Sequence, residues 1–212
     1  MSSKPIPITQ CQKPRGWLGR FTLHRMNASH SKLTDWGLSQ LSVSPNFTIL
    51  DAGCGGGRTV SKLATLTPQG HVFGIDYSAD SVSVSQKLNA PAIAAGRVQI
   101  QQASVSQLPF ADGTFDLVTG VETHFWWPNL ATDLLEIFRV IKPSGQFAII
   151  AEVYKGATHL ASRLAEKYAD RTAMKLLTPD EHRELLAAAG FRVAQLDTIP
   201  NKGWIFALAQ KP

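Results

Sequence analysis

The chain has 212 residues, of which 44% are hydrophobic and 17% are charged, a composition typical of an ordinary globular protein. A domain of this size buries enough surface to fold without disulfides or a metal. The two cysteines, Cys11 and Cys54, are too few for a disulfide-rich scaffold or a cysteine-ligated zinc cluster. The chain lacks both a run of about 18 apolar residues and an apolar signal segment. We therefore expect no membrane insertion and a cytoplasmic location.

The net charge of +5 is concentrated in one segment. Residues 1–45 hold six of the 21 Lys and Arg residues and one of the 16 acidic residues, so residues 46–212 hold 15 of each sign. Nucleic-acid-binding domains usually carry their basic surface across the main domain. We therefore interpret residues 1–45 as a basic N-terminal arm with lid helices and residues 46–212 as a single domain. Nucleic acid is kept only as an alternative partner.

Helix and strand patterns follow one another along the chain in a regular order. Two short amphipathic helices are predicted first, at 17–26 and 31–41. Strands and helices then alternate, which is typical of a parallel sheet with helices on both faces, and a closing strand–turn–strand adds one antiparallel strand. The predicted strands are 47–51, 71–76, 97–101, 114–121, 146–153, 191–196 and 204–209, and the helices between them are 58–66, 80–89, 130–141, 158–173 and 178–190.

Local signals mark several of these boundaries. Ser78 is a suitable N-cap for a helix at 80–89, although the alternation of valine and serine inside that segment is typical of a strand. Thr178, followed by a proline and by Glu181, predicts a helix that begins with a capping box. The Lys-Pro-Ser-Gly sequence at 142–145 is expected to form a turn that closes the preceding helix.

The most informative segment is a glycine-rich loop at 51–57, Asp-Ala-Gly-Cys-Gly-Gly-Gly, between a predicted strand and a predicted helix. Glycines let the backbone approach a ligand closely, and the helix N-terminus offers unpaired N–H groups. The dinucleotide fingerprint does not fit, because its third glycine would fall on Arg58. Instead, Asp51 is followed by glycines two, four and six positions later. A carboxylate there suits a ligand with a positive amino group better than a pyrophosphate.

This spacing resembles motif I of the class I S-adenosylmethionine-dependent methyltransferases. Further motifs occur in the order of that family: Asp76 at a strand end, Leu-Pro-Phe-Ala-Asp-Gly-Thr-Phe-Asp at 108–116, and Phe-Arg-Val-Ile-Lys-Pro-Ser-Gly at 138–145. The resemblance covers about residues 46–210 and is to small-molecule, methyltransferase-11-like members. It implies a Rossmann-like α/β fold with a seven-stranded, mostly parallel sheet, helices on both faces and one antiparallel C-terminal strand.

The resemblance also implies the cofactor S-adenosylmethionine and the product S-adenosylhomocysteine. In this family the acidic residue at the position of Asp76 binds both ribose hydroxyls. Ser104 stands where an aspartate usually binds the adenine amino group, and its hydroxyl keeps an acceptor but no charge. Tyr77 offers a flat face beside the adenine ring. The residues expected to contact the cofactor are Asp51, Gly53, Cys54, Gly55, Asp76, Tyr77, Ser104, Val105, Glu122 and Asn27.

The segment 122–128, Glu-Thr-His-Phe-Trp-Trp-Pro, follows the fourth predicted strand, where the family often places contacts to the methyl acceptor. His124 is a candidate general base, or else a loop histidine that only shapes the pocket. Trp126 and Trp127 either wall the acceptor site or belong to the core. Glu122 either contacts the cofactor's amino end or the acceptor, or is a structural carboxylate.

The segment before the first predicted strand is expected to fold over the cofactor as a lid that excludes water. Asn27 and His30 are candidates for reaching into the site, with His30 as a second catalytic candidate. The alternative is that they belong to helix caps. Cys54 is expected to be a small packing residue in the glycine loop and not a nucleophile. The sequence shows no metal-ligand spacing, so no metal is predicted.

These observations predict methyl transfer from S-adenosylmethionine to a small-molecule acceptor by in-line displacement, with both reactants held close and dry. Residues 154–190 are expected to form an acceptor-side insert, with Tyr154, His159, Tyr168 and Met174 as candidate lining residues. The acceptor atom and the oligomeric state stay open. The alternatives are a nucleic-acid methyltransferase that uses the basic arm, and a catalytically silent domain that keeps the cofactor fold. A nicotinamide-dependent oxidoreductase is disfavoured by the missing third glycine.

Overall fold

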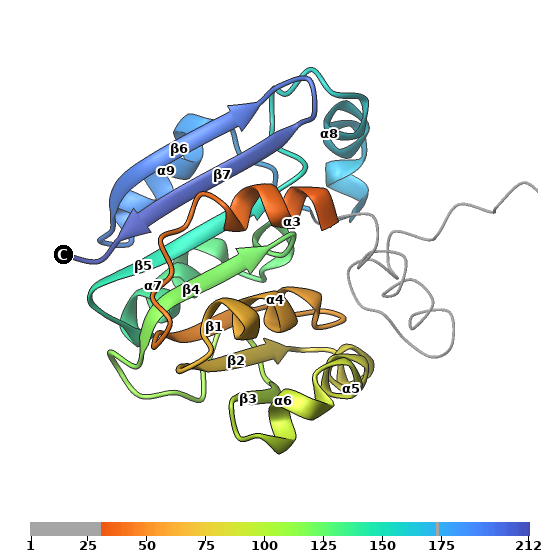
Figure 1. Ribbon diagram of the computed structural model, residues 1–212. Coiled ribbons are helices and arrows are strands. Elements are labelled where there is room, and N and C mark those ends of the chain that lie inside the picture. Colours follow the sequence, from red (N-terminus) through yellow and green to blue (C-terminus); the bar gives the residue numbers. More distant parts are fainter. Residues whose placement is uncertain (1–30, 173) are drawn as a thin grey trace, which may run out of the picture.

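The computed structural model describes residues 31–172 and 174–212, which form a seven-stranded sheet flanked by helices (Figure 1). The strand order is β3-β2-β1-β4-β5-β7-β6, and all neighbours are parallel except the two pairs that β7 makes. The predicted fold class is confirmed. The strands are β1 (Thr48–Ala52), β2 (His71–Asp76), β3 (Val98–Gln102), β4 (Phe115–Val121), β5 (Ile141–Ala151), β6 (Arg192–Ile199) and β7 (Trp204–Gln210).

The centre of the sheet is apolar on both of its faces. Ile49 and Leu50 on β1 are both fully buried. Because successive strand residues point to opposite faces, Ile49 packs into one hydrophobic cluster and Leu50 into another. Such strands belong in the middle of a parallel sheet. The strand order reverses between β1 and β4, and a crevice outside the carboxyl ends of the strands is expected at that point.

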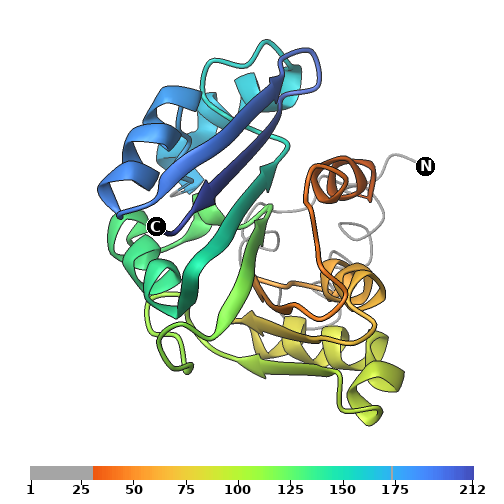
Figure 2. The same ribbon diagram turned by 60° about the vertical axis from the view of Figure 1, so that its left-hand side comes forward.

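The helices divide between the two faces of the sheet (Figures 1 and 2). The cluster around Ile49 takes apolar residues from α3, α4 and α5, and the cluster around Leu50 takes them from α7 and α9. The helices are α3 (Ser31–Leu38), α4 (Arg58–Leu66), α5 (Ala79–Leu88), α6 (Ala90–Ala94), the 3-10 helix η1 (His124–Trp126), α7 (Leu130–Val140), α8 (Leu160–Thr172) and α9 (Pro179–Ala188).

The segment with conflicting signals is a helix, α5. The Ser78 hydroxyl accepts a hydrogen bond from the Ser81 amide at 3.4 Å, which confirms the predicted N-cap. Ser81, Val82 and Ser85 are the buried positions, and this spacing places them on one helical face against the sheet. The alternation of valine and serine was therefore a misleading strand signal. Serines are buried on the same face as Val82, so the polarity of a residue does not indicate its burial here. The short helix α6 directly after it was not predicted.

The expected turn at 142–145 is part of a strand. α7 ends at Val140, and β5 begins at once with Ile141. The pairing of β5 with β4 moves from Phe115–Ile141 to Leu117–Gln146, so residues 142–145 lie in an irregularity of the ladder. Pro143 has no N–H to donate, and Ser144 has a positive φ of 63°. The residues that favour a turn therefore lie inside β5, where they interrupt its pairing with β4. They do not form a separate turn between α7 and the strand.

The capping box before α9 is confirmed. The Glu181 amide donates to the Thr178 hydroxyl at 3.1 Å, and the Thr178 amide donates to the Glu181 carboxylate at 2.7 Å. The helix predicted at 31–41 is α3, which ends three residues earlier, and the helix predicted at 17–26 lies outside the described residues. Among the residues that the structure describes, no helix is long and apolar enough to cross a membrane.

Candidate active site

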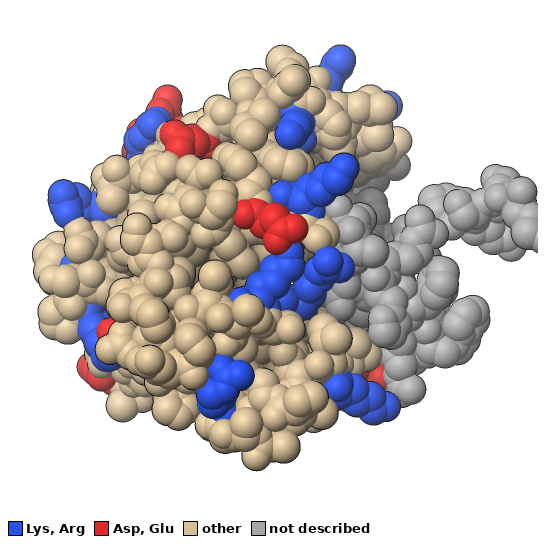
Figure 3. Space-filling model, viewed as in Figure 1, with Lys and Arg blue, Asp and Glu red and all other residues tan. Residues whose placement is uncertain are grey.

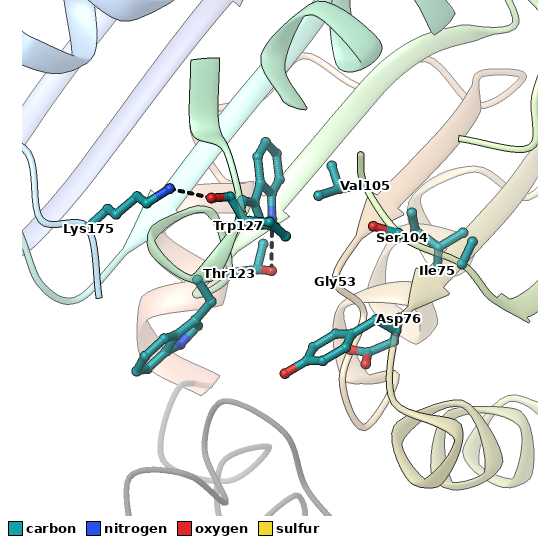
Figure 4. A pocket seen from close by; sticks show the side chains of 12 residues that line it. Gly53, Ile75, Asp76, Ser104, Val105, Thr123, Trp127 and Lys175 are labelled. Carbon is teal, nitrogen blue, oxygen red and sulfur yellow. Dashed lines mark hydrogen bonds between the residues drawn. The ribbon is translucent and has the colours of Figure 1, made fainter. Parts of the chain in front are cut away.

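A cavity of about 330 Å³ opens at the carboxyl ends of the central strands, where the strand order reverses (Figure 4). Residues that follow β1, β2, β3 and β4 line it, together with one residue that precedes α9. The lining residues are Gly53, Ile75, Asp76, Tyr77, Ala103, Ser104, Val105, Thr123, Trp126, Trp127, Pro128 and Lys175. Seven of these were named as candidates from the sequence: Gly53, Asp76, Tyr77, Ser104, Val105, Trp126 and Trp127.

The glycine loop is fixed to the end of the neighbouring strand. The amides of Gly53 and Cys54 both donate to the Ile75 carbonyl, at 2.9 and 2.8 Å. Gly53 has a φ of 85°, and a Cβ on this residue would overlap the Thr123 side chain. Position 53 therefore requires glycine both for its backbone conformation and for the close approach of the segment after β4.

Asp76 ends β2 and borders the cavity. Its carboxylate accepts from the Gly55 amide at 3.0 Å and from the Ser78 amide at 2.8 Å. Burial raises the pKa of Asp76, and the two backbone hydrogen bonds oppose that rise. The carboxylate is therefore held in place by two loops, and Tyr77 stands next to it with 40% of its surface exposed. Figure 4 shows Asp76 and Ser104 on the same side of the cavity.

Asp51 belongs to β1 and does not line the cavity. Only 2% of its surface is exposed, and its carboxylate accepts from the Thr119 hydroxyl at 2.8 Å. Burial raises the pKa of Asp51 to about 7, against the opposing hydrogen bond from Thr119 and with a further contribution from the charge of Asp76. The Asp51 carboxylate is thus buried and hydrogen-bonded to β4, and its contact with the cofactor stays a prediction.

The loop after β3 supplies the next part of the lining. The Ser104 hydroxyl accepts from the Ser106 amide at 3.2 Å, and Ser104 is itself exposed to the cavity. Val105 beside it is buried and belongs to the hydrophobic core. The lining here has one hydroxyl and one apolar face.

The segment after β4 forms the opposite wall. The Trp127 indole N–H donates to the Thr123 hydroxyl at 3.2 Å, and the same threonine faces Gly53 across the cavity floor. Trp127 is 4% exposed and stacks on Phe147 of the core at a centroid distance of 6.1 Å. Trp126 is half-buried beside it. Trp127 therefore lines the cavity and also belongs to the core, and its role as a wall of the acceptor site stays a prediction.

His124 is not positioned as a general base. It is 2% exposed, does not line the cavity, and its Nε2 lies 3.0 Å from Nε2 of His182 on α9. His182 Nδ1 lies 2.8 Å from the Thr178 carbonyl, which can only accept, so that nitrogen carries a proton. In the neutral pair His124 Nε2 is then the donor, and its unprotonated Nδ1 is buried without a hydrogen-bond partner.

The protonation of this histidine pair follows from its surroundings. Burial lowers the pKa of His124 well below the ordinary value, and the nearby His182 lowers it further. Burial also lowers the pKa of His182, against the opposing hydrogen bond to Thr178. The pair therefore stays neutral and joins η1 to the first turn of α9. We interpret it as a structural connection beneath the tryptophan wall.

The other predicted residues have structural surroundings or are not described. Glu122 has a φ of 56° and its carboxylate accepts from the Glu152 amide, in agreement with the structural alternative. Cys54 is buried, its Sγ lies 3.8 Å from the Ser85 hydroxyl, and burial raises the pKa of its thiol, which fits a packing role. Asn27 and His30 lie outside the described residues. The described residues contain no group of three or more His, Cys, Asp or Glu side chains that could hold a metal.

Five lining residues were not named as candidates from the sequence: Ile75, Ala103, Thr123, Pro128 and Lys175. Lys175 lines the cavity, whereas the four candidates proposed for this part of the chain, Tyr154, His159, Tyr168 and Met174, do not. Met174 and Leu176 pack against an apolar cluster below η1, so the lysine between them points the other way. The alternation of apolar and charged residues at 174–176 was the signal in the sequence that could have identified Lys175. Thr123 was passed over because its neighbours His124 and Glu122 carry more conspicuous chemistry.

Comparisons with known proteins show which proteins this chain is similar to. A family model described as a methyltransferase domain matches residues 50–149. An O-methyltransferase of Pyrenophora dematioidea is 30% identical over 74% of this chain and 59% of its own length. The ubiquinone/menaquinone biosynthesis C-methyltransferase UbiE of Geotalea daltonii is 27% identical over 74% of this chain and 76% of its own. The chain spans about three fifths of the length of the O-methyltransferase relatives.

A solved structure extends the comparison to the fold. A methyltransferase from Aquifex aeolicus, described as S-adenosylmethionine-dependent, superposes with a TM-score of 0.75 at 18% identity, covering 91% of this chain and 98% of the other. The two chains therefore share a fold. Together, the family match over residues 50–149, the relatives and this fold support a class I S-adenosylmethionine-dependent methyltransferase, in agreement with the motifs at 51–57 and 108–116, with S-adenosylmethionine as the cofactor.

Proposed function

We propose that this protein transfers the methyl group of S-adenosylmethionine to a small-molecule acceptor by in-line displacement and releases S-adenosylhomocysteine. One observation carries the proposal: a single cavity joins Asp76 and the glycine loop at one end to a tryptophan wall at the other. Gly53 and Thr123 meet between the two ends. The names of the relatives include both an O- and a C-methyltransferase, so the acceptor atom stays open.

The residues of the first half fit the cofactor. The Asp76 carboxylate borders the cavity and suits two ribose hydroxyls. Ser104 and Tyr77 suit the adenine ring, by a hydrogen bond to its amino group and by contact with its face. Gly53 lines the cavity beside Thr123 and presents backbone to a ligand, without a side chain of its own. When bound, S-adenosylmethionine supplies a methyl group on a sulfonium that an incoming nucleophile can displace.

The second half positions the acceptor and excludes water. The indole of Trp127 is fixed by Thr123 and by stacking on Phe147, so this wall is rigid. The titratable residues in the lining are Asp76, Tyr77 and Lys175, and none of them is a histidine. The protein thus contributes proximity and a dry surface. An acceptor that is already nucleophilic suits this site best.

The charge distribution favours a small acceptor over nucleic acid. On the face of the molecule that Figure 3 shows, Lys and Arg side chains lie in small groups with wide uncharged areas between them. Residues 46–212 carry 15 basic and 15 acidic groups. The tight binding of a polyanion usually needs a continuous basic surface. A silent domain is disfavoured because the cavity is open and Asp76 borders it.

Calorimetric titration with S-adenosylhomocysteine, with NAD as the control ligand, tests the cofactor half. We expect micromolar binding of the first and none of the second. Asp76→Asn should weaken S-adenosylhomocysteine binding about 100-fold, because charge-assisted hydrogen bonds to the ribose are lost. The matched control is Asp197→Asn, which changes an exposed carboxylate on the edge strand β6 and should leave the affinity unchanged.

The outcomes separate the alternatives. Absence of S-adenosylhomocysteine binding to the folded protein would overturn the proposed function. Equal affinities of the parent protein and Asp76→Asn would show that the ribose lies elsewhere. Release of S-adenosylhomocysteine from S-adenosylmethionine in the presence of a small-molecule panel, and not of RNA or DNA, then establishes the class of acceptor.

A further inference from the structure

Lys175 is a cation set into an otherwise apolar wall. Its backbone amide donates to the Phe125 carbonyl at 2.9 Å, and its Nζ donates to the Pro128 carbonyl at 2.5 Å. Both acceptors belong to the segment that carries the tryptophans. Both the backbone and the side chain of Lys175 are thus hydrogen-bonded to the segment 122–128, although Lys175 lies about 50 residues away from it in the chain. Figure 4 shows it across the cavity from Asp76 and Ser104.

The ammonium group of Lys175 keeps donors for a ligand. Within the described part of the chain no carboxylate pairs with it, whereas Lys62, Lys142 and Lys155 each form a salt bridge. An ammonium has three N–H donors, and the Pro128 carbonyl takes one of them. Two donors remain at the edge of the cavity.

The neighbours of Lys175 in the lining set the shape of what it binds. Trp126, Trp127 and Pro128 are flat apolar surfaces on the same segment. Apolar walls exclude water and strengthen an ionic hydrogen bond at their edge. The negative charge in the lining, Asp76, lies at the opposite end and is already held by the Gly55 and Ser78 amides. The cavity is therefore polarised, with its positive end at the acceptor wall.

We propose that the methyl acceptor is a flat, apolar molecule that carries a carboxylate, with its body against Trp126 and Trp127 and its carboxylate on Lys175. This inference rests on the proposed function, because it names the substrate class of the same cavity. Lys175 is then a specificity-determining residue: it selects acids over their neutral analogues. The arrangement also places a negatively charged acceptor opposite a positively charged methyl donor.

Matched ligand pairs test this selection. We would titrate the protein, loaded with S-adenosylhomocysteine, with 4-hydroxybenzoate, 2-naphthoate and indole-3-acetate, and with the primary amide of each. We expect acids to bind about tenfold more tightly than their amides, the size of one charge-assisted hydrogen bond at an accessible site. Because Lys175 is exposed, raising the ionic strength from about 0.05 M to about 0.3 M should weaken the binding of acids and spare that of amides.

Variants assign the effect to Lys175. Lys175→Met should reduce acid binding to the level of the amides, and Lys175→Arg should restore most of the preference. Lys155→Met is the matched control: this exposed lysine pairs with Glu181 and does not line the cavity, so its removal should leave the preference intact. Thermal melting of each variant verifies that it is folded.

Three results would overturn the inference: no binding by any acid, equal binding of acids and amides, or an acid preference that survives in Lys175→Met. Repeating the titrations without S-adenosylhomocysteine separates this inference from the proposed function. Failure of S-adenosylhomocysteine to bind refutes the cofactor assignment, whereas the acid preference of the cavity is measured independently of it.

Discussion

The two halves of the cavity, which we assign to the cofactor and to the methyl acceptor, are built in different ways. The cofactor half consists of loops that directly follow β1, β2 and β3, and its backbone is bonded to the end of β2 through the Ile75 carbonyl and the Asp76 carboxylate. The acceptor half joins η1 to Lys175, which precedes α9, and their contacts bridge about 50 residues. The first half is made by strand ends, and the second by a long-range contact between loops.

The buried titratable groups under the two halves have pKa values that are shifted in opposite directions. Burial raises the pKa of Asp51 under the cofactor half, and burial lowers the pKa of the His124–His182 pair under the acceptor half. Both sites keep a neutral form inside the protein. Asp51 and the His124–His182 pair therefore make the stability of the protein change with pH in opposite directions. Each contribution can be removed by its own substitution.

The largest expected effect comes from the point where the halves meet. Gly53→Ala places a Cβ into the Thr123 side chain at a φ of 85°, and strain plus overpacking should lower the free energy of unfolding by about 4 kcal/mol. Gly96→Ala is the matched control, because Gly96 has a φ of 73° and nothing near the added Cβ. Urea unfolding should show a loss of about 1 kcal/mol there. Equal losses in the two variants would mean that the halves are not in close contact.

Asp51→Asn should remove the proton dependence of the cofactor half. The pKa of Asp51 rises from 3.8 to about 7 on folding, so between these values the folded state binds more protons, and stability falls as the pH rises. The variant should be more stable than the parent at pH 8 by on the order of 4 kcal/mol and about equal to it at pH 4. Chemical unfolding across this range measures the difference. A constant difference at every pH would contradict the buried, neutral Asp51.

The cofactor half could be predicted from the sequence because its residues are tied to strand ends. Asp51, the glycines after it and Asp76 stand at fixed positions relative to strand patterns, and parallel strands bring their carboxyl ends to one edge. Even so, the sequence did not reveal that Asp51 is buried under the loop. Burial depends on how closely β1 and β4 pack, and the hydroxyl of Thr119 that satisfies Asp51 comes from β4.

The acceptor half could not be predicted in the same way. His124 has the chemistry of a base, but whether it faces the cavity depends on the pairing of η1 with His182 on α9. Likewise, the lining role of Lys175 follows from its contacts with Phe125 and Pro128. The hydrophobic periodicity of the sequence gives no information about such contacts between distant segments. The turn at 142–145 shows the same limit, because its residues bend a strand that tertiary pairing continues.

His182→Leu tests the support of the acceptor half. The variant leaves the N–H of His124 buried without an acceptor, which should cost about 1–2 kcal/mol of stability at pH 7.5. The double variant His124→Leu/His182→Leu should recover part of this loss, because both polar partners are removed together. Neither variant should change S-adenosylhomocysteine affinity. A loss of that affinity would mean that the two halves do not act separately.

The pH dependence of the same variants gives the sign of the effect. The lowered pKa values mean that, below about pH 6.5, the unfolded state takes up protons that the folded state does not, so the pair makes stability fall as the pH falls. The double variant should lose this acid sensitivity, measured by urea unfolding at pH 5 and 7.5, whereas Asp51→Asn should keep it. If both variants lost it, the supports would be coupled.

The smallest effect is a gain of affinity in the cofactor half. Ser104→Asp adds a carboxylate where the hydroxyl faces the cavity, and a charged acceptor binds an amino group more strongly than a neutral one does. We expect S-adenosylhomocysteine to bind about threefold to tenfold more tightly by calorimetry, a modest gain because Ser104 is exposed to water. Ser106→Asp introduces the same charge two residues away, at an exposed position outside the lining, and should change little. If both variants gained affinity equally, the gain would come from the electrostatic field of the added negative charge and not from a direct contact with the adenine amino group. If neither gained, the adenine amino group would lie away from Ser104, and the cofactor half would depend on Asp76 and the glycine loop alone.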